Sequence, residues 1–92
     1  NAAFRGFGSP QGLFVVESMM DQVARYLKMD PLVLRKLNFY KEGDKTPIGI
    51  PLSDFTVPRM WDQILKDSKM EEKRKEIAKW NQEHQYIKRG IY

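Results

Sequence analysis

The sequence predicts a mainly α-helical chain, with about four helices that follow a glycine-rich loop. Apolar residues recur at helical spacing in four segments, and turn-forming residues gather between the second and third of them. The 92 residues are 41% hydrophobic and 30% charged, which is ordinary globular composition rather than that of a disordered chain. They fit one small domain or a piece of a larger one.

Residues 1–12 form the glycine-rich loop, which contains Gly6, Gly8 and Gly12 together with Pro10. Glycine permits positive φ and the close approach of a ligand, and proline suits the first turn of a helix. Backbone N–H groups would therefore meet a helix N-terminus, which favours an anionic or polar ligand. The glycine spacing misses the dinucleotide fingerprint by one residue, and the lysine of a P-loop is lacking. On glycine content alone, a plain structural turn is favoured.

Residues 13–40 read as a helical pair. The first helix is expected over 11–28, and Glu17 and Asp21 lie on its polar face. A catalytic carboxylate is conceivable there because the loop is near, but solvated helix charges are the favoured interpretation. Asp30 and Pro31 indicate an N-cap and first position of a second helix. That helix runs through Leu37 and ends at 38–40.

Residues 41–54 form a turn-rich link. Two glycines and two prolines favour turns, and the alternating Ile48, Ile50 and Leu52 allow a short edge strand.

Residues 55–85 read as a second helical pair. Thr56 is the expected cap of the third helix, whose apolar stripe includes Trp61 as a core residue. Ser68 is the expected cap of a fourth helix from Lys69 to about 84, with only a thin apolar stripe. His84 is the only histidine, and a surface or C-cap position is favoured over catalysis. Residues 86–92 leave this helix and read as the start of a strand.

Charge and cysteine content exclude several functions. The net charge is +4, but acidic residues interrupt the basic run from 66 to 74, so we expect a solvated face and no nucleic-acid partner. Cysteine is absent, which excludes disulfides, thiolate metal sites and iron–sulfur ligands in this chain. No apolar run approaches the ~20 residues that span a bilayer, and we expect no membrane partner. The chain begins in mid-motif without a methionine, so we expect a fragment of a soluble, cytoplasmic protein.

Four strings of the sequence resemble one family. The string AFRGFGSPQG resembles the molybdopterin-contacting loop of the xanthine dehydrogenase and aldehyde oxidase family. The strings LNFYKEGDKT, FTVPRMWDQIL and KWNQEHQYIKRG resemble later segments of the same molybdenum-binding region, in the same order. The resemblance covers nearly the whole chain and is closest to the eukaryotic xanthine dehydrogenases, although Ser9 departs from the glycine expected there. It implies that the chain is part of a larger α+β domain.

The resemblance also implies roles for residues of the loop. Arg5 matches the position of a main-chain contact to the cofactor, Gly6 gives that contact room, and Phe4 would be a buried anchor beside them. Phe7 matches the position of an aromatic ring that stacks on the substrate. Gln11 is a weaker candidate for a polar contact behind these groups. No catalytic residue or metal ligand is assigned to this chain, because none of its glutamates matches the family's base.

The implied function is oxidative hydroxylation of purines such as hypoxanthine or xanthine, in purine catabolism. The chain would contribute part of a molybdenum–molybdopterin site, while FAD and 2Fe–2S centres would lie elsewhere in a homodimeric parent enzyme. The parent would be cytoplasmic or peroxisomal, and this chain by itself would be inactive. Two alternatives stay open, namely an aldehyde oxidase fragment and a non-catalytic helical interaction module.

Overall fold

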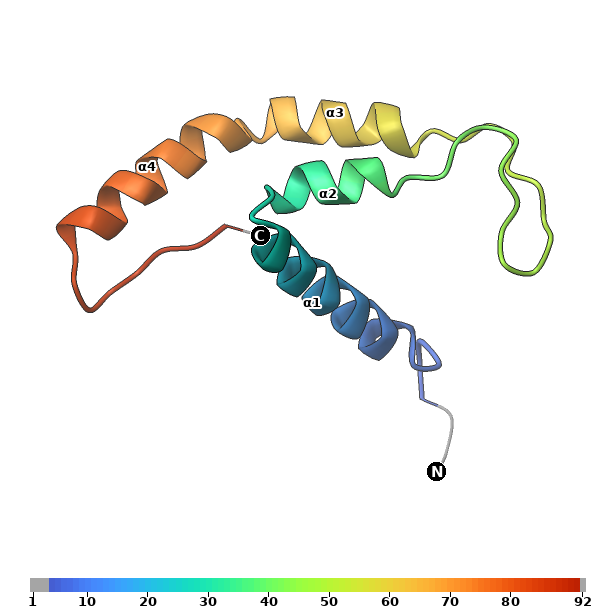
Figure 1. Cartoon of the computed structure of the whole chain (residues 1–92), viewed down its shortest axis with the longest axis horizontal. Helices are drawn as coiled ribbons and strands as arrows, with labels where there is room; N and C mark the ends of the chain where they lie inside the picture. Colours follow the sequence, from blue (N-terminus) through green and yellow to red (C-terminus); the bar gives the residue numbers. More distant parts are fainter. Residues whose placement is uncertain (1–3, 92) are drawn as a thin grey trace. The chain divides into compact units, whose positions relative to one another are not determined.

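The computed structural model describes residues 4–91, and within them the chain forms four α-helices and no strand (Figure 1). The helices are α1 (Ser9–Leu27), α2 (Pro31–Leu37), α3 (Val57–Asp67) and α4 (Met70–Glu83). The predicted mainly α chain is therefore confirmed. The helices fall into two compact units, Asn1–Asp44 with α1 and α2, and Lys45–Tyr92 with α3 and α4.

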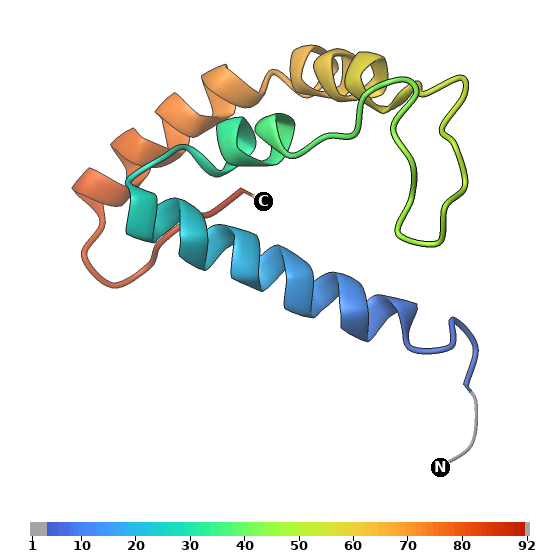
Figure 2. The same ribbon diagram turned by 45° about the vertical axis from the view of Figure 1, so that its right-hand side comes forward.

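The first unit is a helix pair whose connecting turn is fixed by the ends of the two helices (Figure 2). Lys28 ends α1 in the left-handed region at φ 53°, and the N–H of Met29 donates to the carbonyl of Ala24 over 2.9 Å. This pattern is a Schellman-type C-cap. Asp30 then caps α2, accepting a 2.7 Å hydrogen bond from the N–H of Leu32. The predicted Asp30–Pro31 helix start is thus confirmed.

Very little of the first unit is buried. Ala24 of α1 is fully buried and Leu34 of α2 is 7% exposed, and they are the only buried residues in the described part of the chain. Elsewhere on α1, many large apolar side chains are exposed to solvent, among them Leu13, Phe14 and Val16. A pair of buried aliphatic side chains contributes only a few kcal/mol, so other interactions must orient the two helices.

The turn-rich link does not form the edge strand that the alternation of Ile48, Ile50 and Leu52 suggested. Among residues 4–91, pairing here is limited to a single antiparallel bridge between Lys45 and Pro51. The chain instead reverses direction, because the N–H of Gly49 donates to the carbonyl of Thr46 over 2.8 Å. Prolines at 47 and 51 have no N–H to donate to a ladder, so the turn chemistry prevails over the alternation.

In the second unit, α3 and α4 are separated by two residues, Ser68 and Lys69. Ser68 is the C-cap of α3 rather than the cap of α4, and its hydroxyl donates to the carbonyl of Leu65. Lys69 holds the N-cap position of α4 in the left-handed region, at φ 51°. Thr56 does precede α3, but its hydroxyl contacts the sulfur of Met60 and caps no N–H. Trp61, expected in a core, is only half-buried.

The chain after α4 is held by polar contacts with the last turns of the helix. The side-chain amide of Asn81 donates to the carbonyl of Arg89 and accepts from its N–H, at 2.9 and 2.8 Å. The ammonium of Lys88 donates to the carbonyls of Asn81 and His84, which satisfies exposed helix-end acceptors. Residues 84–91 are irregular, and the strand expected over 86–92 has no ladder partner among the described residues.

Replacing Lys28 by glycine should stabilise the first unit. A non-glycine residue in the left-handed region costs about 1 kcal/mol relative to glycine, and nothing in the C-cap of α1 uses the lysine side chain. We expect the free energy of unfolding in urea, followed by circular dichroism, to rise by about that amount. Arg25→Gly, inside the last turn of α1, should instead lower it by about 1 kcal/mol. A loss of stability in Lys28→Gly would contradict the cap geometry.

The isolated 92-residue polypeptide should bind a hydrophobic dye or associate with itself. Its apolar side chains lie mostly on the surface, and exposed apolar area of this extent marks an interaction surface. Dye fluorescence and sedimentation measure the two effects. Phe14→Glu, which places a charge on the exposed face of α1, should reduce both. A monomeric sample that binds no dye and melts cooperatively would show that the chain is an autonomous domain.

Candidate functional site

The loop before α1 adopts an unusual backbone conformation. Gly6, Phe7 and Gly8 are three consecutive residues with positive φ, at 93°, 48° and 86°. Two turn hydrogen bonds hold this path, from the N–H of Phe7 to the carbonyl of Phe4 and from the N–H of Ser9 to the carbonyl of Gly6. Glycine adopts these angles without strain, whereas Phe7 stores about 1–2 kcal/mol. Strain of this kind gathers at ligand-contacting segments.

The loop ends at the positive end of the α1 macrodipole. Gly8 is the N-cap and offers no side-chain acceptor, and the first turn of α1 contains no acidic residue. Among the described residues, the backbone N–H groups of Gly8 and Gln11 donate to no acceptor. Arg5 adds a positive charge two residues before Phe7. The site therefore combines open N–H donors with positive potential, which suits an anionic ligand.

The two aromatic rings of the loop are both exposed, Phe4 at 85% and Phe7 at 86%. Phe4 is thus not buried within this chain, and its role as a buried anchor stays a prediction about the larger domain. Phe7 projects from between its two glycines, and the space around Gly8 is open, since an added Cβ there would meet no atom within 4 Å. Gly6 is tighter, because an added Cβ would lie 3.2 Å from the ring of Pro10.

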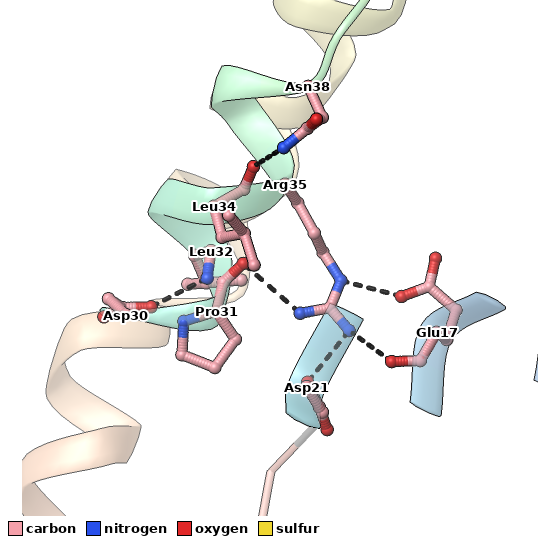
Figure 3. Close-up of polar contacts among 8 residues, drawn as sticks. All are labelled: Glu17, Asp21, Asp30, Pro31, Leu32, Leu34, Arg35 and Asn38. Atoms are coloured by element: carbon pink, nitrogen blue, oxygen red, sulfur yellow. Dashed lines mark hydrogen bonds and ion pairs between the residues drawn. The ribbon is translucent and has the colours of Figure 1, made fainter. Parts of the chain in front are cut away.

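An ion-pair cluster joins α1 to α2 two turns beyond the loop (Figure 3). Arg35 of α2 donates from Nε to Glu17 over 2.7 Å and from Nη2 to Asp21 over 3.0 Å. Its Nη1 donates to the carbonyl of Pro31, one turn back in α2, over 3.3 Å. The arginine side chain is only 13% exposed. Both acids of α1 are therefore paired with Arg35, although the Glu17 side chain remains 41% exposed.

Arg35 is not among the site residues predicted from the sequence, although the sequence contains an indication of its role. Two acids four residues apart share one helix face, and the nearby second helix carries a single arginine. A short connection makes two helices antiparallel neighbours, so this arginine could reach the acids. Nothing in the sequence by itself distinguishes it from the adjacent Lys36, because the rotation of α2 decides which of the two faces α1.

The only histidine lies at the end of α4, as predicted. His84 is the C-cap, its ring stacks on Trp80 at 3.6 Å between centroids, and its Nδ1 lies 2.9 Å from the carbonyl of Trp80. The guanidinium carbon of Arg89 lies 3.5 Å from the centre of the Trp80 ring. This arrangement is a stacked helix end, in which the imidazole contacts the ring and the carbonyl of Trp80.

No group of three or more histidine, cysteine or acidic side chains within residues 4–91 is positioned to hold a metal ion. None of the helices in that range combines the length and apolar character that crossing a bilayer requires.

Comparison with known proteins places the loop in a family. Residues 1–39 match the model of the molybdopterin cofactor-binding domain. Over 91 residues, 99% of the chain, it is 46% identical to xanthine dehydrogenase of Emericella nidulans and 47% identical to that of Drosophila pseudoobscura pseudoobscura. It is 41% identical to xanthine dehydrogenase/oxidase of Mus musculus over the same length. The chain belongs to the molybdopterin-binding region of the xanthine dehydrogenase family.

The family match covers the structural features of the first unit described above. Its range of residues 1–39 contains the strained loop, both helices of the first unit and the Arg35 cluster. The chain spans 7% of the length of each of these xanthine dehydrogenases. The exposed apolar face of α1 is consistent with a segment that forms only a small part of such a protein.

Proposed function

We propose that this chain is a segment of a larger molybdenum hydroxylase, and that residues 4–12 contact its molybdopterin cofactor and its substrate. The observation that carries the proposal is the left-handed run from Gly6 to Gly8 directly before α1, inside the range that matches the cofactor-binding family. Open N–H donors, a helix N-terminus and Arg5 make this end of α1 attractive to the anionic phosphate of a pterin cofactor.

Different residues of the loop would make different contacts with the cofactor. Arg5 contributes a main-chain contact to the cofactor, Gly6 keeps the backbone close to it, and Phe4 lies beside that contact. Gln11, in the first turn of α1, supplies a polar contact behind them. When bound, the molybdenum–molybdopterin group supplies the oxidising centre for hydroxylation of the substrate.

Phe7 would hold the substrate. Its exposed ring offers an aromatic face for offset stacking, which contributes about 0.5–1.5 kcal/mol and also orients a flat ring. The relatives are named xanthine dehydrogenases, so we propose a purine such as hypoxanthine or xanthine as the substrate. An aldehyde is the alternative, and it would gain less from the stack.

The rest of the enzyme would lie outside this chain. The proposal includes FAD and 2Fe–2S centres in other parts of the protein, a homodimeric assembly and a cytoplasmic location. The general base is also expected elsewhere, because Arg35 already engages the two acids nearest to the loop, Glu17 and Asp21.

The role of Phe7 can be tested in the full-length enzyme. Phe7→Leu keeps an apolar side chain without a ring, and we expect kcat/KM for xanthine to fall about tenfold from lost stacking and orientation. Phe7→Tyr keeps the ring and should retain most of the activity. A small aliphatic aldehyde should be affected less than xanthine by Phe7→Leu. Equal losses on both substrates, accompanied by depleted molybdenum, would show that Phe7 is structural.

The 92-residue polypeptide by itself should not turn over xanthine, even with molybdenum cofactor supplied. The base and the other redox centres lie outside it, so cofactor contact alone gives no catalysis. Steady-state oxidation of xanthine, with the full-length enzyme assayed in parallel, measures this. Turnover by the pure polypeptide would place a complete active site within these residues.

A further inference from the structure

The apolar packing of the first unit secures only the later half of α1. Ala24, its one buried residue, lies near the C-terminal end of the helix. Every residue from Ser9 to Val16 is exposed. Within the described residues, the contact nearest to the first half of α1 therefore sets the direction of that half, and of the loop in front of it, relative to α2.

The Arg35 cluster is that contact. Glu17 lies eight residues after Ser9, about 12 Å along the helix axis at 1.5 Å per residue. Arg35 forms ion pairs with both Glu17 and Asp21, which are one turn apart on the same face of α1 (Figure 3). These two ion pairs from one guanidinium are called the two-point grip. Its third nitrogen is tied to the carbonyl of Pro31, so the guanidinium is itself fixed to α2. A two-point grip fixes the rotation of α1 as well as its distance from α2.

Only arginine provides this grip. Its planar fork presents several N–H donors in a rigid arrangement, whereas lysine presents one ammonium on a flexible stem. Without the guanidinium, two carboxylates on successive turns would repel each other at a partly buried place. The charge of the cluster and its geometry therefore both depend on one side chain.

We propose that Arg35 is a positioning residue, which sets the direction of α1 through Glu17 and Asp21 and thereby places the loop of residues 4–12 against the ligand. This inference rests on the proposed function. Displacement of reacting groups by as little as 1 Å can cost about 100-fold in rate, so a small rotation of α1 would be seen in kinetics before it is seen in folding.

The test uses the full-length enzyme and expresses activity per bound molybdenum. Arg35→Lys keeps the positive charge and loses the two-point grip, and we expect kcat/KM for xanthine to fall about tenfold or more with molybdenum content and melting temperature nearly unchanged. Arg25→Lys, the same substitution at an exposed position of α1, should match the wild type. Glu17→Gln removes one partner of the grip and should give a similar loss.

A double variant separates positioning from independent effects. If Arg35 acts through Glu17, Arg35→Lys combined with Glu17→Gln should lose much less than the two single losses multiplied together. Wild-type activity per molybdenum in Arg35→Lys, or a loss of molybdenum with normal activity in the remaining sites, would overturn the positioning role. If Arg35→Lys does not fold, Glu17→Gln bears the test by the same criteria. If the wild-type full-length protein binds no molybdenum, or does not oxidise xanthine, the proposed function itself is refuted.

Discussion

The grip of Arg35 on Glu17 and Asp21 is the interaction on which the first unit depends. Two buried side chains give too little apolar contact to define how α1 and α2 cross. A guanidinium that is 13% exposed and bonded to both helices supplies the missing definition. Partly buried ion pairs contribute uncertain amounts to stability, because desolvation offsets attraction. Their directionality is the larger effect here, since a fork with fixed geometry allows few relative orientations of the two helices.

The orientation of α1 that these ion pairs set also determines where the loop in front of α1 points. Three successive residues with positive φ bend the chain sharply, and the backbone of Phe7 is strained in this conformation. Such a bend is useful only if the helix behind it is held, because the open N–H groups of Gly8 and Gln11 are aimed by the axis of α1. The molybdopterin-binding match covers the bend, the helix and the grip together. These three features form one structural element in the xanthine dehydrogenase family segment.

The second unit is organised by its helix ends rather than by a core. None of its described residues is buried. Lys69 lies between α3 and α4. Hydrogen bonds of the Asn81 and Lys88 side chains hold the chain after α4 against the end of that helix. His84 and Arg89 associate with the ring of Trp80. Local polar and stacking contacts thus define this unit, while its apolar side chains lie on the surface, where a larger protein would provide their packing partners.

Features that depend on neighbours along the chain can be predicted from the amino-acid sequence. Apolar spacing located four helices, Asp30 and Pro31 marked a helix start, and the glycines around Phe7 indicated a bend at a helix N-terminus, all because propensity and capping act over a few residues. Tertiary structure decided what depends on the rotation of one helix against another. It placed Arg35 against Glu17 and Asp21, and it left Phe4 exposed. It also showed that Ser68 ends one helix instead of starting the next. These outcomes follow from contacts across space, which spacing along the sequence does not encode.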